Sequence, residues 1–366
     1  MERGSSKLDA NQPMSQDRAR KLLEDGAVFM LLDVPPGTEF GIDCNCWNTG
    51  DKFKGVKMIP PGLHFVYYSA VSKQGETAPR TGFFHNFQGQ EFLVKKWDKY
   101  SEDISSDAAS AEEVRTFREN LRDLDGFLGA YPYDSYKKWV SLSSHITPAA
   151  VARLQPLSGA VVSATQLEPA AATTTAEQRR RVVLDADNLP LMVPRAGTEI
   201  RFTTIARRSF PAGGTPADIT KCSMDRSYVL ASLFAADDDV LAELQFAFVC
   251  FLVGNVYDAF EQWKSLVALL CGSADATAAR PRLFSDFVSV LYHQVREIPE
   301  DFFVDVVTRG NFLTTTLREF FATLETDDGV DAALRDKGLR FRAHLTKKFR
   351  WDFVSEPAED APVIVE

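Results

Sequence analysis

The chain has 366 residues, of which 45% are hydrophobic and 25% are charged, and its formal net charge is −10. This length predicts two or three domains, and the negative charge argues against a broad nucleic-acid-binding surface, because phosphate contacts need a basic face. Five scattered cysteines, a polar N-terminus and no apolar run near the roughly 18 residues of a membrane helix favour a soluble protein of the cytoplasm or nucleus with reduced thiols.

Strand patterns dominate the first hundred residues. A continuous apolar run over residues 27–34 ends at a Pro-Pro-Gly turn, which predicts a buried strand. Shorter strand patterns follow over residues 40–47, 53–59, 63–71, 82–87 and 92–97. Short strands with Gly/Pro turns and no long helices between them predict antiparallel β packing in a sandwich or barrel.

Helical patterns flank this β region and then give way to a different composition. Helices are expected over residues 111–128, 136–142 and 148–154. Residues 156–192 contain the low-complexity run AAATTTA and few apolar side chains, so burial there would not repay the entropy of ordering the chain. This stretch is therefore predicted to be a flexible linker.

The pattern from Thr215 onward is helical. Thr215 followed by Pro216 is a typical helix start, and Leu241, Leu244 and Phe248 recur at helical spacing. Further helices are expected over residues 282–296, 301–308, 312–323 and 330–349. Short-looped amphipathic helices in succession predict a compact bundle or a solenoid-like array.

These patterns define the predicted organisation as an α+β multidomain protein. Residues 1–155 form a β-rich, sandwich-like N-terminal domain with flanking helices, and residues 156–192 form the linker. Residues 193–349 form an all-helical C-terminal domain, and residues 350–366 form an extended acidic tail.

The tail has the composition of a strand without a partner. Val363, Ile364 and Val365 favour a strand, whereas Pro357 and Pro362 disfavour a helix. Such a segment can add a strand to an exposed sheet edge of a partner, although it could instead fold back onto the chain's own β domain. The expected partner-binding residues are Trp351, Asp352, Phe353, Val354, Pro362, Val363, Ile364 and Val365.

The motif search favours a protein without catalytic chemistry. The sequence contains no phosphate-binding loop, no nucleophile elbow and no HExxH. Cys44 and Cys46 are too closely spaced for a zinc knuckle, and the acids around Asp123 lack the other ligands of a calcium loop. We therefore expect no catalytic residue, no cofactor and no metal, although a hydrolase site assembled in space stays a remote alternative.

A single-stranded RNA-binding module is the competing interpretation. The aromatic strand 65–68 could stack bases, and the basic last helix could contact phosphates. Because no basic residues flank the strand, a sheet core with one solvated face is favoured instead. Direct nucleic-acid binding is not expected.

Six longer stretches carry a family resemblance. They are GTEFGID (37–43), FKGVKMIPPGLHF (53–65), LGAYPYDSYKKWVSL (128–142), PRAGTEIRF (194–202), ELQFAFVCFLVGNVYDAFEQWK (243–264) and HLTKKFRWDF (344–353). The chain resembles the A-one cistron splicing factor (Aar-two) family and looks like a vertebrate-type member. The resemblance runs from about residue 27 onward, with the linker unmatched.

This resemblance implies a function in splicing without catalysis. It implies an assembly chaperone of the U-five small nuclear ribonucleoprotein (snRNP) that binds the scaffold protein Prp-eight through its RNase H-like and Jab/MPN-like domains. The C-terminal tail would help to join those domains, and the helicase that uses the same surface would be held off. The implied partners are Prp-eight and U-five snRNP assembly intermediates, with no membrane, and the expected localisation is cytoplasmic and nuclear.

Overall fold

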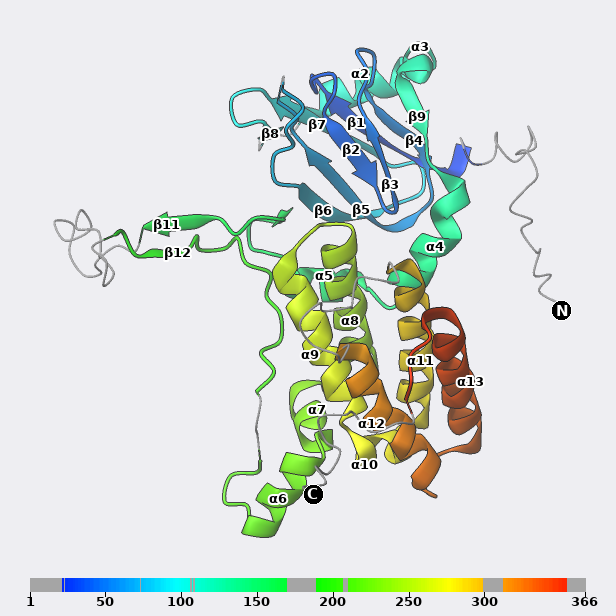
Figure 1. Cartoon of the computed structure of the whole chain (residues 1–366). Coiled ribbons are helices and arrows are strands. Elements are labelled where there is room, and N and C mark those ends of the chain that lie inside the picture. The colour runs from blue at the N-terminus through cyan, green and yellow to red at the C-terminus, as the bar shows by residue number, and fades with distance from the viewer. Residues whose placement is uncertain are drawn as a thin grey trace, which may run out of the picture. The chain divides into compact units, whose positions relative to one another are not determined.

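The computed structural model describes residues 22, 24–72, 74–105, 107, 109–169, 189–206, 210–298 and 312–353. These residues form two compact units, a β-rich unit and a helical unit (Figure 1). The β-rich unit takes its described residues from 1–140, 151–200 and 253–256, and the helical unit takes its own from 141–150, 201–252 and 257–366. The predicted fold class, β-rich and then helical, is confirmed.

The first sheet of the β-rich unit is mixed. In spatial order its strands are β8 (Asp103–Ile104), β7 (Phe92–Asp98), β1 (Ala27–Leu32), β4 (Gly55–Ile59) and β9 (Leu128–Ala130). β1 runs parallel to β7 and antiparallel to β4, so the expectation of purely antiparallel packing is wrong for this sheet. A parallel pair needs a long crossover connection, and here strands of the second sheet supply it in place of a helix.

The second sheet is antiparallel and packs on the first. Its strands, in spatial order, are β10 (Val161–Val162), β6 (Thr81–Phe87), β5 (Gly62–Ser69), β2 (Glu39–Ile42) and β3 (Asn45–Asn48). Phe29 of β1 and Phe40 of β2 are both fully buried, and their rings stack with centroids 6.0 Å apart. They belong to one apolar cluster that takes residues from both sheets, so the arrangement is a sandwich.

Helices cover the other face of the first sheet. These helices are α2 (Ala111–Glu119) and α3 (Leu121–Leu124). Their side chains Val114, Phe117 and Leu121 pack on the β1 side chains of that face, which include Val28 and Met30. Every residue of β1 is therefore buried, because both of its faces are covered. This double coverage explains the uninterrupted apolar run in the sequence. After α3 the chain continues through η1 (Asp125–Phe127), α4 (Tyr133–Ser143) and α5 (Pro148–Leu154).

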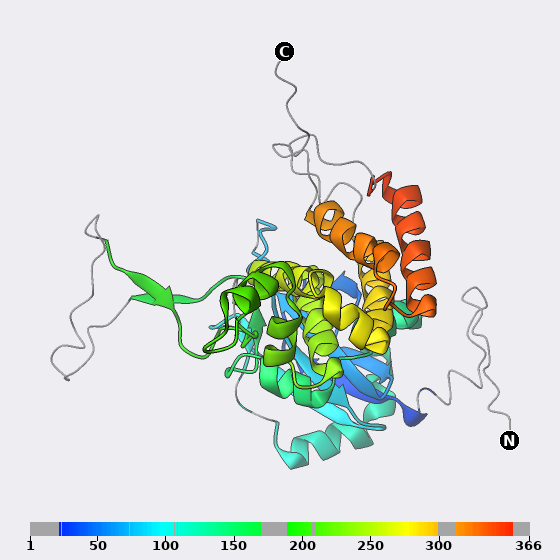
Figure 2. The same ribbon diagram turned by 90° about the horizontal axis from the view of Figure 1, so that it is seen from below.

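The predicted linker differs from the structure at both of its ends. β10 pairs with β6 at the edge of the second sheet, and β11 (Leu167–Pro169) pairs with β12 (Met192–Pro194) in a separate two-stranded ribbon, visible in Figures 1 and 2. Val161 is 2% exposed, so even a two-residue strand contributes to the core. Strands this short leave too weak a periodic signal to be read from sequence. Residues 170–188 lie outside the described residues.

The helical unit contains eight described helices. They are α6 (Pro216–Met224), α7 (Ser227–Leu233), α8 (Asp237–Leu252), α9 (Tyr257–Cys271), α10 (Ala274–Ala279), α11 (Pro281–Glu297), α12 (Phe312–Thr326) and α13 (Ala332–Phe349). Figure 2 shows α12 and α13 side by side, as does Figure 1. α8 is buried continuously from Val240 to Cys250, so it forms the centre of the unit. The helix expected over 301–308 falls outside the described residues.

α8 carries two polar side chains into the core. Glu243 accepts hydrogen bonds from the backbone N–H and the hydroxyl of Thr203, at 2.8 and 2.7 Å, and from the amide of Gln262 at 2.9 Å. Gln245 accepts from the backbone N–H of His145 at 2.7 Å and donates to the Ser141 carbonyl at 3.2 Å. Buried polar groups need such partners, so these bonds fix distant segments to α8.

A buried ionic group holds the sandwich. Asp43 Oδ2 accepts from the Tyr131 hydroxyl at 2.5 Å and lies 2.6 Å from His64 Nδ1, while His64 Nε2 lies 2.8 Å from the Pro60 carbonyl oxygen. Both nitrogens of His64 thus face oxygen atoms, which fixes the orientation of the ring. Asp43 Oδ1 accepts from the Phe65 N–H at 2.9 Å, and neither Asp43 nor His64 is more than 1% exposed.

Replacing the buried carboxylate is expected to destabilise the β-rich unit. Asp43→Asn replaces a buried carboxylate that accepts from Tyr131 and Phe65, and a buried donor left without its acceptor costs about 1–3 kcal/mol of unfolding free energy. Urea unfolding monitored by tryptophan fluorescence measures this loss. The exposed Asp51 gives a matched control, since Asp51→Asn is expected to change the unfolding free energy by less than about 0.5 kcal/mol. Equal effects of the two substitutions would contradict the structural role of the buried Asp43 hydrogen bonds.

Candidate functional site

The candidate site begins where α13 ends, because the predicted partner-binding tail leaves the helical unit there. The helix starts at Asp331, whose carboxylate accepts from the Leu334 N–H at 3.0 Å. It ends at Arg350, whose backbone N–H donates to the Thr346 carbonyl at 2.9 Å. Lys347 and Lys348 lie in the last turn, where cations complement the helix dipole.

Arg350 turns the chain back toward α12. Its backbone φ is 57°, in the left-handed region, which costs a non-glycine residue about 1 kcal/mol. Aromatic packing on both sides of Arg350 offsets this cost. Phe349 and Trp351 stack with centroids 4.5 Å apart, and Phe353 meets Phe321 of α12 edge-on at 5.1 Å.

The backbone of the turn is held as well as its side chains. Arg318 of α12 donates from its guanidinium to the carbonyl oxygen of Asp352 at 3.3 Å. Trp351 contacts Phe353 edge-on at 6.4 Å, so the two aromatic residues and the backbone between them form one packed unit on α12. The tail therefore departs from a defined position on the helical unit.

The structure describes three of the eight predicted partner-binding residues. Trp351 is half-buried and Asp352 is exposed, whereas Phe353 is 6% exposed. We expected Phe353 to contact a partner, but its ring packs inside its own unit, because α12 supplies Phe321 as a neighbour that sequence spacing did not reveal. Val354, Pro362, Val363, Ile364 and Val365 lie outside the described residues, and their pairing with a partner strand stays a prediction.

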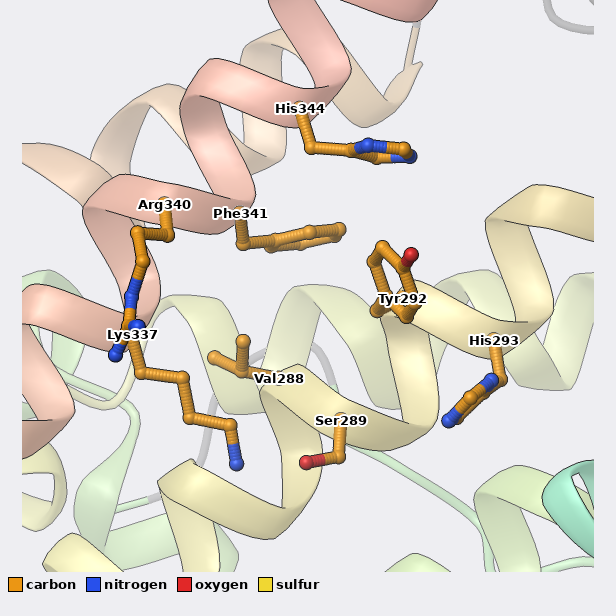
Figure 3. Close-up of a pocket in the computed structure, with 8 residues that line it drawn as sticks. All are labelled: Val288, Ser289, Tyr292, His293, Lys337, Arg340, Phe341 and His344. Carbon is orange, nitrogen blue, oxygen red and sulfur yellow. The ribbon is translucent and has the colours of Figure 1, made fainter. Parts of the chain in front are cut away.

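A groove between α11 and α13 is a second feature, which the sequence analysis did not identify. Its volume is about 220 Å³. Figure 3 shows Tyr292 from α11 facing the rings of Phe341 and His344 from α13. The groove is lined by Val288, Ser289, Tyr292, His293, Lys337, Arg340, Phe341 and His344. A possible sequence signal was the spacing of Lys337, Arg340 and His344, which places basic groups on one side of a helix.

The polar groups of this groove share a positive environment. Burial lowers the pKa of His344, and the cations Lys348, Arg296 and Lys347 lower it further. Burial also lowers the pKa of His293, an effect that Arg296 strengthens and Glu297 opposes. Within the described residues, Nε2 of His344 is buried without a hydrogen-bond partner. The groove therefore combines apolar walls with a potential that favours an anion.

The aromatic strand of the RNA-binding alternative is not available for base stacking. Val66 and Tyr68 point into the sandwich core, and the relative exposures of Phe65 and Tyr67 are 0% and 3%. The guanidinium of Arg80 lies over the Tyr67 ring, 4.6 Å from its centroid. The prediction of one solvated face is wrong for this strand, and so is the proposed stacking platform.

Among the described residues, no group of three or more His, Cys, Asp or Glu side chains is placed to hold a metal ion. No helix in the described ranges is long and apolar enough to cross a membrane.

Comparison with known proteins gives matches over both units. The AAR2 N-terminal domain matches residues 25–156, and the AAR2 C-terminal repeat region matches residues 202–354. Protein AAR2 homolog from Macaca fascicularis is 47% identical over 372 residues, covering 96% of this chain and 97% of that protein. Protein AAR2 homolog from Caenorhabditis elegans is 38% identical over 351 residues, covering 91% and 96%.

A more distant relative has a name that states a function. A1 cistron-splicing factor AAR2 from Saccharomyces cerevisiae is 22% identical over 290 residues, covering 74% of this chain and 77% of that protein. The vertebrate-type resemblance and the family seen in the sequence are both confirmed by these matches.

Removing the Phe353 ring is expected to release the start of the tail. Phe353→Ala should lower the unfolding free energy of the helical unit by about 3 kcal/mol, because a buried aromatic ring is lost. Amide hydrogen exchange at residues 350–353 should rise in the folded protein. Phe210 is a matched control, since its ring is 47% exposed and Phe210→Ala removes little packing. Unchanged exchange at residues 350–353 would show that Phe353 does not hold the turn.

Proposed function

The chain belongs to the AAR2 family, and from this premise we propose that it is a non-enzymatic assembly factor for pre-mRNA splicing. The observation that carries the proposal is the match over both units and through the end of α13 to residue 354. The yeast relative is named as a splicing factor, and AAR2 is not a known enzyme family. Membership therefore supports a role in splicing without catalysis.

The proposed partner is Prp-eight, during biogenesis of the U-five snRNP. The family resemblance in the sequence supports contacts to its RNase H-like and Jab/MPN-like domains. Occupying that surface would hold off the helicase until the particle is assembled. The proposed localisation is cytoplasmic and nuclear.

The proposed contact is strand addition by the tail. A strand gains affinity from main-chain hydrogen bonds to an exposed sheet edge, and alternate side chains supply specificity. The fixed departure point at Arg350 and Phe353 supports this mechanism, because it limits the positions that the tail can reach. The four acids that follow Phe353, with no Lys or Arg among them, would favour a basic partner surface.

Truncation after Phe353 tests the tail's contribution to partner binding. We expect the affinity for a Prp-eight fragment with the RNase H-like and Jab/MPN-like domains to fall at least about tenfold, measured by calorimetry. An unchanged affinity would exclude the tail as a contact. If the full chain does not bind the fragment, the choice of partner is contradicted.

A proline scan tests strand pairing. Ile364→Pro removes a backbone donor within the expected strand and should weaken binding nearly as much as the truncation does. Ala358→Pro in the acidic spacer is the matched control and should leave the affinity within about twofold. Equal losses from both substitutions would point to a contact other than a ladder of hydrogen bonds.

A further inference from the structure

We propose that the groove between α11 and α13 binds the chain's own acidic tail, residues 354–366, when no partner is bound. The contact concerns the free chain and does not depend on the identity of the partner. Only the role of this contact in controlling partner binding by the tail rests on the proposed function. Three properties of the groove and the tail support this contact, namely charge, apolar complementarity and reach.

The charges of the groove and the tail are complementary. The groove presents Lys337 and Arg340 from α13, and Arg296 and Lys348 lie close enough to influence its histidines. Acidic groups near these cations are Asp336, which pairs with Arg340 at 2.5 Å, together with Asp286 and Glu297. The tail beyond Phe353 supplies Glu356, Glu359, Asp360 and Glu366 without a single cation.

The groove also has groups that an acidic peptide would satisfy. Burial lowers the pKa of the Lys337 ammonium, which Asp286 opposes and Arg340 strengthens. Its Nζ donates to the carbonyl and hydroxyl oxygens of Ser285 at 2.6 and 2.9 Å, which fixes the cation at the groove. The buried Nε2 of His344, without a partner among the described residues, could donate to a carboxylate once protonated.

The groove and the tail also have complementary apolar surfaces. Val288, Tyr292 and Phe341 form walls without charge, and Tyr292 and His344 face each other with ring centroids 4.9 Å apart (Figure 3). The tail carries Val363, Ile364 and Val365 three residues beyond its central acids. One segment can therefore place carboxylates on the cations and aliphatic side chains on the aromatic walls.

The tail is long enough to reach the groove. The tail begins at Phe353, which contacts Phe321 at 5.1 Å, and Phe321 in turn contacts Phe341 of the groove at 6.2 Å. The thirteen residues of the tail span about 40 Å when extended, which is enough to pass around a helix about 10 Å in diameter. Glu359 and Asp360, six and seven residues beyond Phe353, reach about 20–25 Å along an extended chain, which covers the roughly 20 Å of α13 between Lys337 and Phe349.

Histidine titration by NMR tests this contact in the free chain. The ring signals of all five histidines are followed against pH in the full chain and in a chain truncated after Phe353. We expect truncation to lower the pKa of His293 and His344, because nearby carboxylates that stabilise their charged forms are removed. His85 and His145 in other parts of the chain are internal controls and should not change. Identical titration of His293 and His344 in both chains would overturn the proposal.

A synthetic peptide of residues 354–366, added to the truncated chain, identifies the binding residues. Its addition should restore the titration of His293 and His344 at low salt and lose this effect at high salt. Lys337→Gln with Arg340→Gln should weaken peptide binding at least about tenfold, whereas Arg115→Gln on α2 should leave it unchanged. Equal binding to all variants would place the peptide elsewhere and refute the proposed groove.

The same measurements separate other occupants. If the histidine shifts in the full chain depend on protein concentration, the tail of a second copy fills the groove and the intrachain contact is refuted. If the free chain shows the shifts but the Prp-eight fragment does not bind, the groove contact stands and the proposed function fails. If the fragment binds and the shifts are absent, the proposed function stands and the groove contact fails.

Discussion

A carboxylate cannot be buried without hydrogen-bond donors around it, and both units of this chain are organised by that constraint. Asp43 draws together the turn after β2, the strand β5 and the segment after β9 through His64, Phe65 and Tyr131. In the helical unit, Glu243 binds the extended segment at Thr203 and the helix α9 through Gln262. In each unit the buried carboxylate has its hydrogen-bond donors only when those distant segments are in place.

The start of the tail likewise combines an unfavourable backbone conformation with contacts that stabilise it. Arg350 adopts a left-handed backbone that its side chain disfavours, and the aromatic contacts of Trp351 and Phe353 stabilise the reversal. A segment that leaves a domain at a fixed point has a high effective concentration near that domain and near any partner that docks beside it. The conformation of one residue thus connects the packing of α12 and α13 to the reach of the tail.

The sequence predicted most of what local patterns encode. The run over residues 27–34 indicated a buried strand because both faces of β1 are covered, and the apolar spacing in α8 and α13 indicated their helices. The parallel pairing of β1 with β7 was not predictable, because pairing depends on contacts far apart in sequence. The burial of Phe353 and the groove at Tyr292 were missed for the same reason, since each needs a neighbour from another helix.

If the tail binds at both proposed sites, the fraction of chains whose tail occupies the groove sets the apparent affinity for the partner. The apparent affinity of a partner that needs a free tail falls by the fraction of time that the tail is free. If the groove holds the tail for about nine-tenths of the time, partner binding weakens only about tenfold, or roughly 1.4 kcal/mol. A weak contact is therefore sufficient to occupy the tail in the free chain, because the proposed main-chain hydrogen bonds to a partner sheet would displace it. The shallow, partly solvated groove at Tyr292 and Arg340 is suited to such a contact, whereas a deep site would compete with the partner itself.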